Sequence, residues 1–181
     1  MHTETFEITG RADSHRASRQ LNVVIAYADF SSVTLARQIL KESLPALASH
    51  FVVNTTFWKF ELLDFPRLRQ IATEDAAQAQ IIIISAHKEY GLPEGAKNWV
   101  ESCLTNPAVK DVAFVGVVKD EELLPSYGDS LPEDIEQFPG KGRSDVFWFI
   151  ANENDGQKPA ADKIIQLACQ HPAGHRAGVN Q

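Results

Sequence analysis

The sequence predicts an α/β fold, a three-layer doubly wound sandwich with a five-stranded parallel sheet in the order 2-1-3-4-5. The first observation is Ile81–Ile84, four consecutive isoleucines followed by Ser85, which is typical of a strand buried on both faces. The second is the spacing of five apolar runs, which begin near residues 21, 52, 80, 112 and 146 and alternate with helix-like or loop segments. Such alternation requires parallel strands joined by right-handed crossovers, with the isoleucine strand at the centre.

Composition limits the classes of protein to which the chain can belong. Its 181 residues suit one domain, and we expect a mobile N-terminal arm over residues 1–20, the domain over 21–170 and a C-terminal tail over 171–181. The net charge of −7 argues against nucleic-acid binding, because an acidic surface repels a phosphate backbone. No apolar run is long enough to span a bilayer and no secretory pattern is visible, so we expect a cytoplasmic protein with no membrane partner.

The cysteines and histidines indicate no metal or redox site. Cys103 and Cys169 lie beside apolar positions on predicted helices, and we expect two buried free thiols. His171 and His175 are four residues apart, but a proline and a glycine near them oppose a helix and no third ligand is nearby. Because protein zinc sites need three or four ligands, we predict no metal site.

The first half of the chain reads as two strands with a helix between them. Leu21–Tyr27 is predicted as the first strand. Ser31 or Ser32 can cap the helix that follows, and Pro45 should kink that helix or end it at the preceding residue. Phe51–Trp58 mixes β-branched and aromatic residues with polar ones, which suits a less buried, edge-like strand.

The middle of the chain carries two helices and a second doubly buried strand. After an irregular segment, Asp64 is expected as the N-cap of the second helix, with Pro66 in its first turn. Pro93 is placed to open the third helix. Val112–Val118 is the next buried strand, in which Gly116 indicates a close backbone approach or a bulge.

Lys119–Arg143 is the longest irregular region and carries seven acidic residues. A long loop in a compact domain is often functional, but a solvated acidic face remains an equal alternative. Asp145–Ala151 is predicted as the fifth strand, and Pro159 is expected to open the last helix.

Residues 79–104, AQIIIISAHKEYGLPEGAKNWVESCL, resemble the corresponding stretch of flavodoxins and flavodoxin-like FMN reductases. In that family a buried strand runs into a loop with small, aromatic and glycine residues, and Leu-Pro then opens a helix. The order of elements is similar over residues 21–170. The resemblance implies an FMN phosphate site after the first strand, where hydroxyls, a glycine and the N–H groups of a helix N-terminus hold the anion.

The loop that matches this phosphate site is Ala28–Thr34. Hydroxyl groups on Ser31, Ser32 and Thr34 are the candidate phosphate ligands. The family's Thr-Gly pair is absent, and Asp29 adds a negative charge, so the loop reads as degenerate and no cofactor is firmly predicted. Helix capping by the two serines is the alternative interpretation of their role.

Candidate ring-binding residues come from the same resemblance, since aromatic side chains flank the flavin in flavodoxins. Tyr90 and Tyr127 are the candidates here, followed by Phe30 and Trp58, although aromatic residues in loops also cover the edges of a core. His87 follows the central strand and is the first choice for a functional histidine, but we favour a solvent-exposed or capping role for it.

The candidate binding set brings these residues together, and no catalytic residue is assigned. Its members are Asp29, Phe30, Ser31, Ser32, Thr34, His87, Tyr90 and Gly91. A small ligand should lie between the loops 28–34 and 86–91, because crossovers that leave adjacent strands on opposite faces open a crevice there.

Two functional hypotheses follow from the sequence. The first is a non-catalytic flavodoxin-like domain with a degenerate cofactor loop, which contacts a protein partner or a small anionic ligand at the carboxyl ends of its strands. The alternative is an FMN-binding flavodoxin-like oxidoreductase or electron carrier.

Overall fold

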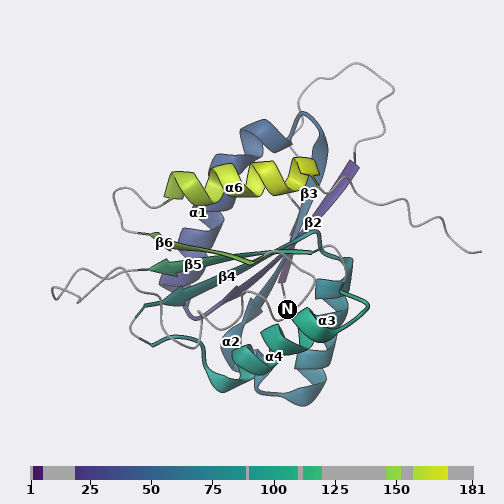
Figure 1. The fold of residues 1–181 in the computed structure, drawn as a ribbon, viewed down its shortest axis with the longest axis vertical. Coiled ribbons are helices and arrows are strands. Elements are labelled where there is room, and N and C mark those ends of the chain that lie inside the picture. Colours follow the sequence, from purple (N-terminus) through teal and green to yellow (C-terminus); the bar gives the residue numbers. More distant parts are fainter. Residues whose placement is uncertain are drawn as a thin grey trace, which may run out of the picture.

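The structure, a computed structural model, describes residues 2–5, 19–88, 90–109, 112–119, 146–151 and 157–170. The strands are β1 (His2–Thr5), β2 (Arg19–Tyr27), β3 (Phe51–Lys59), β4 (Ile81–His87), β5 (Ala113–Lys119) and β6 (Val146–Ala151). The helices are α1 (Phe30–Leu47), α2 (Phe60–Leu63), α3 (Pro66–Gln78), α4 (Glu94–Thr105) and α6 (Gln157–Gln170). Helices α1 and α6 cover one face of the sheet, and α2, α3 and α4 cover the other (Figure 1).

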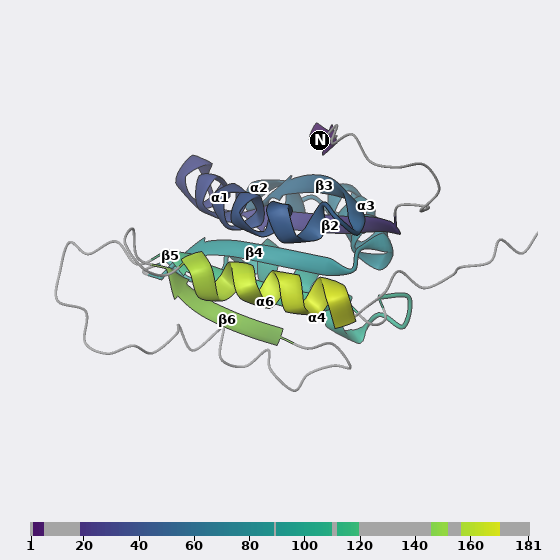
Figure 2. The same ribbon diagram turned by 90° about the horizontal axis from the view of Figure 1, so that it is seen from above.

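The sheet has the predicted parallel order. Five strands pair in the order β3-β2-β4-β5-β6, which is 2-1-3-4-5 when the parallel strands are numbered along the chain. Figure 2 shows these strands side by side, with α1 and α6 in front of them. In β4, Ile83 pairs with Ile25 on one side and Val115 on the other. The fold prediction is therefore confirmed.

The isoleucine strand separates two hydrophobic clusters. Ile81 and Ile83 pack in the cluster that contains the buried residues of α1 and α6. Ile82 and Ile84 pack in the cluster on the opposite face, together with Trp99 of α4. Because successive side chains of a strand point to opposite faces, a strand between two helical layers needs apolar residues at every position.

A sixth strand, β1, lies at one edge of the sheet and was not predicted. It pairs antiparallel with β3, with His2 opposite Phe57 and Thr5 opposite Asn54. This finding corrects the predicted arm for residues 2–5, which lie on the sheet edge. The segment is short and polar, so its pairing depends on the open hydrogen-bonding edge of β3 rather than on a hydrophobic pattern of its own. The rest of the predicted arm, up to residue 18, lies outside the described residues.

The end of α1 differs from the prediction. Pro45 does not end the helix at Leu44, because α1 continues to Leu47. Leu47 is fully buried, and the N–H of Ala48 still donates to the carbonyl of Leu44 at 2.8 Å. A proline this close to the C-terminus removes one backbone hydrogen bond, and the buried leucine offsets that loss.

The start of α3 is shifted by one residue from the prediction. Phe65 rather than Asp64 is the N-cap, and Pro66 occupies the first turn as expected. Asp64 instead packs against α4, where a Cβ atom on Gly95 would overlap its carboxylate. The segment before Asp64, expected to be irregular, forms the short helix α2.

Gly116 makes room for the indole of Trp148, rather than for the close backbone approach or bulge that the sequence predicts. Gly116 pairs with Trp148 of β6, and a Cβ atom at this position would overlap the Trp148 ring. Any larger residue at position 116 therefore has to displace the indole.

The two cysteines lie in different environments. Cys103 is buried, whereas Cys169 is exposed, which corrects the expectation of two buried thiols. Burial outweighs a hydrogen bond with Thr73 and raises the pKa of the Cys103 thiol from 9.0 to about 12.

Several predictions fall outside the described part of the chain, namely residues 120–143 of the acidic segment, Tyr127 among them, and the C-terminal tail from residue 171. Within the described residues, no group of three or more His, Cys, Asp and Glu side chains is arranged to hold a metal. None of the described helices has the length and apolar character needed to cross a membrane.

Candidate functional site

The connection between β2 and α1 is tied to the carboxyl end of the central strand. The two strands are neighbours, with Tyr27 opposite Ser85. The N–H of Ala28 donates to the carbonyl of Ser85 at 3.1 Å. The Ser85 hydroxyl donates in return to the carbonyl of Ser32 at 2.8 Å. These bonds fix the start of α1, with Asp29 beside the end of β4.

Asp29 and Ser32 close the N-terminus of α1 with reciprocal hydrogen bonds. Asp29 Oδ1 accepts from the N–H of Ser32 at 3.0 Å, and Ser32 Oγ accepts from the N–H of Asp29 at 2.9 Å. The same Oγ accepts from the N–H of Ala28 at 3.1 Å and donates to the carbonyl of Asp29 at 3.0 Å. The pair forms a capping box with Asp29 as N-cap and Ser32 as its N3 partner. Ser32 therefore takes part in capping the helix, as the sequence predicts, although the N-cap position itself belongs to Asp29. The polar groups of Ser32 are thus used within the chain.

Asp29 also pairs with His87. The distance from His87 Nε2 to Asp29 Oδ2 is 2.9 Å, and the two side chains are 8% and 53% exposed respectively. The expected solvent-exposed or capping role of His87 is therefore wrong. The reason is that β4 extends past Ser85, which places His87 in the sheet opposite Lys119 of β5 rather than in a solvated loop.

The Asp29 carboxylate is a fixed negative charge at this end of the sheet. Partial burial by itself raises the pKa of Asp29. Hydrogen bonds from the N–H of Ser32, from His87 and from the Ser31 hydroxyl lower it, as does the charge of His87, and together these effects outweigh burial. The net result lowers the pKa of Asp29 from 3.8 to about 2. An anion that approaches the N-terminus of α1 at neutral pH therefore meets an ionised carboxylate.

Three aromatic side chains lie exposed near the same end of the sheet, and we call them the aromatic rim. Phe30 is 84% exposed, Tyr90 81% and Phe65 59%, and these are the exposed large hydrophobic side chains of the described residues. Phe30 begins α1 after β2, Phe65 lies between α2 and α3 after β3, and Tyr90 follows β4. Since β3, β2 and β4 are adjacent, the rim runs along the carboxyl ends of three neighbouring strands.

The loop after β4 holds Tyr90 against the buried histidine. The rings of His87 and Tyr90 meet edge to face, with centroids 6.1 Å apart and planes at 74°. Gly91 has a φ of 58°, a left-handed conformation that favours glycine, and its N–H donates to the carbonyl of His87 at 3.2 Å. The requirement at position 91 is therefore a tight turn.

Two other candidates do not face a ligand. The hydroxyl of Thr34 donates to the carbonyl of Phe30 inside α1, at 2.7 Å. Trp58 is buried, and its Nε1 donates to Asp75 Oδ2 at 2.9 Å. The structure thus brings Asp29, Ser32, His87 and Tyr90 together and leaves the other two in local structural roles.

Sequence reasoning missed the capping function of Asp29 and the exposure of Phe65. A signal for the first was present, because an Asp three residues before a Ser at the start of an apolar helix fits an N-cap and its N3 partner. For Phe65 the signal was its place directly before Pro66, where a helix begins and its N-cap faces solvent.

No family model matches this chain, and no curated protein matches its sequence. Solved structures do match it. A short-chain flavodoxin associated with a non-canonical PDU bacterial microcompartment is 13% identical with a TM-score of 0.55, covering 85% of this chain and 99% of that one. The two-electron reduced flavodoxin of Megasphaera elsdenii is 15% identical with a TM-score of 0.51, covering 82% and 98%. The flavodoxin of Streptococcus pneumoniae TIGR4 is 12% identical with a TM-score of 0.50, covering 84% and 97%.

At these identities the comparisons show the fold. The chain has a flavodoxin-like α/β fold, as the resemblance at residues 79–104 implies. The activity has to be argued from the site itself, since one fold hosts many functions.

Proposed function

We propose that this chain is a non-catalytic flavodoxin-like domain with a degenerate phosphate loop, which acts through protein contacts at the carboxyl ends of its strands. The observation that carries the proposal is the occupied N-terminus of α1. In flavodoxins this position holds the FMN phosphate. Here the Asp29 carboxylate accepts the N–H of Ser32 and pairs with His87.

Binding a phosphate at this position would carry two costs. A carboxylate about 4 Å from an anion disfavours it by roughly 1–4 kcal/mol, depending on the local dielectric. Moving Asp29 aside would in turn break the capping box, and the loss of an N-cap costs about 0.5–2 kcal/mol. Both costs argue against FMN as a bound cofactor of the unmodified chain.

The aromatic rim supports a role in protein contacts. Exposed aromatic side chains supply the buried anchors of many protein interfaces. Phe30 and Tyr90 are more than four-fifths exposed and lie after adjacent strands, so a partner can bury both at once. His87 is buried beneath this surface and pairs with Asp29, which gives it a positioning role for the loop rather than a catalytic one.

The aromatic side chains also favour one alternative, an FMN-binding oxidoreductase or electron carrier. Phe30 and Tyr90 come from the two loops that flank the crevice, and aromatic residues in such loops flank the flavin ring in flavodoxins. The two functions therefore differ at the N-terminus of α1. An electron carrier would bind the FMN phosphate there, whereas the proposed domain closes this position with Asp29.

Titration of FMN fluorescence separates the two functions. We expect no saturable quenching by the wild type and a gain in Asp29→Thr, which removes the charge, keeps an N-cap and adds a hydroxyl. Asp29→Asn is the matched control, because it removes the charge without adding the hydroxyl. Tight FMN binding by the wild type would replace the proposed function by the alternative. If Asp29→Thr gains nothing, the crevice has no latent flavin site.

Site-specific photo-crosslinking tests the protein contact directly. A benzophenone amino acid placed at Phe30 or Tyr90 should give adducts of one common mass in cells. The control position is Ser49, an exposed residue in the turn after α1. Adducts that form equally well at Ser49, or that appear at neither rim position, would contradict the proposed contact surface.

A further inference from the structure

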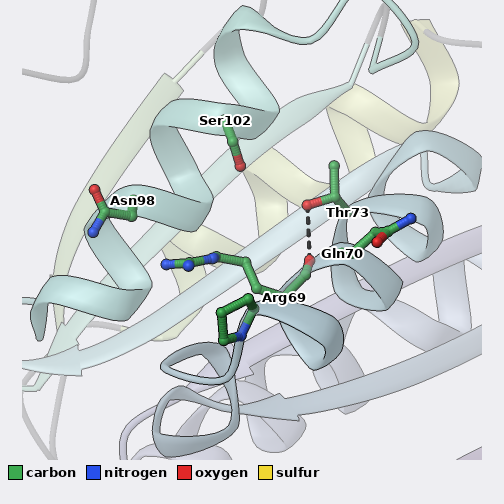
Figure 3. A pocket seen from close by; sticks show the side chains of 6 residues that line it. Arg69, Gln70, Thr73, Asn98 and Ser102 are labelled. Carbon is green, nitrogen blue, oxygen red and sulfur yellow. Dashed lines mark hydrogen bonds between the residues drawn. The ribbon is translucent and has the colours of Figure 1, made fainter.

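A groove with polar side chains along a largely apolar surface lies between α3 and α4, apart from the loops at the carboxyl ends of the strands. It has a volume of about 520 Å³ and is lined by Pro66, Arg69, Gln70, Thr73, Asn98 and Ser102. The volume lies within the range of small-molecule sites, roughly 300–1,000 Å³, but the groove is wide open to solvent and is not an enclosed cavity. Figure 3 shows its two walls, with Arg69, Gln70 and Thr73 on α3 and Asn98 and Ser102 on α4.

Arg69 is the charged side chain of this lining. It is half-buried, and in Figure 3 it extends from α3 across the groove toward the Asn98 side of α4. Among the described residues no carboxylate forms an ion pair with it. The chain has 24 acidic and only 17 basic residues, so carboxylates are plentiful. The unpaired state of Arg69 among the described residues therefore calls for another explanation.

The neighbouring hydroxyl groups already donate their protons to backbone carbonyls, so a ligand can use them only as hydrogen-bond acceptors. Thr73 Oγ1 donates to the carbonyl of Arg69 at 2.9 Å, and Ser102 Oγ donates to the carbonyl of Trp99 at 2.8 Å. Thr73 Oγ1 also hydrogen-bonds with the Cys103 thiol, which leaves it one lone pair as an acceptor, whereas Ser102 Oγ keeps both of its lone pairs. The groove thus combines a donor-only cation with hydroxyl acceptors on the facing helices.

The ligand chemistry that complements this arrangement has an anionic group and hydroxyl donors. We propose that the α3–α4 groove binds a small hydroxylated anion, either a carboxylate or a phosphate ester of a polyol. Its anionic oxygens accept from the Arg69 guanidinium, which suits planar, paired contacts, and its hydroxyls donate to Thr73 and Ser102. This site goes beyond the proposed function and does not depend on it, because it lies between two helices and not at the aromatic rim.

Amide chemical shifts followed by NMR test the site with four probes. Glycerate and glycerol 3-phosphate carry both features and differ in the anionic group. Inorganic phosphate lacks carbon-bound hydroxyls, and glycerol lacks charge. We expect saturable shifts at residues 66–73 and 98–102 with one or both hydroxylated anions. Inorganic phosphate should bind at least about tenfold more weakly, because it lacks the carbon-bound hydroxyls that donate to Thr73 and Ser102, and each lost hydrogen bond weakens binding by a factor of several. Glycerol should give no saturable shifts.

Two arginines on the same helix make a matched pair of variants. Arg69→Ala should abolish the saturable shifts, whereas Arg67→Ala should leave them unchanged, because Arg67 is exposed on α3 and does not line the groove. Ser102→Ala should weaken glycerate or glycerol 3-phosphate and leave the response to inorganic phosphate unchanged. Well-dispersed spectra of each variant establish that the fold is intact.

Three results would overturn the proposal. One is the absence of saturable shifts with every probe. Another is an equal loss of binding in Arg67→Ala and Arg69→Ala, which would indicate unspecific attraction to positive charge. The third is inorganic phosphate binding as tightly as the hydroxylated anions, which would remove the assigned role of Thr73 and Ser102.

Discussion

The loops at the carboxyl ends of β2 and β4 and the α3–α4 groove use their polar groups in opposite ways. At the strand ends, Asp29, Ser32 and Ser85 bond to one another or to nearby backbone atoms. In the groove, among the described residues, Arg69 has no carboxylate partner and the hydroxyl of Ser102 keeps its acceptor lone pairs. The position at which a fold usually binds its ligand can thus be filled by the chain itself, while polar groups left open elsewhere indicate a different site.

The largest expected effect comes from β4, on which both regions depend. Ile83→Ala should lower the free energy of unfolding by about 2–5 kcal/mol, because the side chain is fully buried between paired strands and helices. Urea titration measures the loss. A cost near zero would mean that β4 does not rigidly support the strand-end loops and the α3–α4 groove.

The second prediction contrasts two serines, one in each region. Ser32→Ala leaves the N–H of Asp29 without its acceptor, while the N–H of Ala28 keeps the carbonyl of Ser85, and it should cost about 1–3 kcal/mol. Ser102→Ala removes only a bond to the carbonyl of Trp99 within α4 and should change stability by less than about 0.5 kcal/mol. Equal costs in thermal or urea unfolding would erase the distinction between a region closed by internal bonds and an open one.

The third prediction concerns the acid dependence of stability. Because folding lowers the pKa of Asp29 from 3.8 to about 2, its interactions stabilise the protein above its unfolded-state pKa and are lost as the pH falls toward 2. Asp29→Asn keeps an N-cap but cannot titrate. The stability advantage of the wild type over Asp29→Asn should therefore shrink as the pH falls from about 4 to about 2, as measured by urea unfolding at each pH. A constant difference over this range would show that Asp29 is not held by Ser32 and His87.

The last prediction concerns the rigidity of the α3–α4 groove, which thiol labelling can measure without any substitution. Cys103 is buried in α4 and hydrogen-bonded with Thr73 of the groove wall, and its raised pKa of about 12 leaves little thiolate at neutral pH. A thiol reagent should modify the exposed Cys169 quickly and Cys103 only slowly, as mass spectrometry of labelled peptides would show. Rapid modification of both would mean that α3 and α4 separate readily.

The sheet could be predicted from the sequence because its signal is local. Four isoleucines in succession favour a strand covered on both faces, and the alternation of strands with helices suits the order 2-1-3-4-5. The pairing of Asp29 with His87 could not be predicted in this way. It joins residues 58 positions apart and depends on β4 continuing two residues beyond Ser85, which no periodicity indicates.

The groove was missed for a related reason. Helical periodicity separates the buried face of α3 from its exposed face, but it does not tell which exposed row meets a row of α4. Arg69 and Ser102 become neighbours only through the packing of the two helices. For β1 the missing information was the free edge of β3, since His2–Thr5 has no apolar alternation of its own.

The pairing of β1 with β3 has a consequence for how the protein behaves in concentrated solution. The backbone groups of Asn54–Phe57 on the outer side of β3 are covered by a strand of four residues, which is too short to recruit another chain easily. Removal of residues 2–5 would expose a longer edge rich in aromatic and β-branched residues, and such an edge pairs with copies of itself. An extended segment fused directly before β1 would compete with it for the same edge.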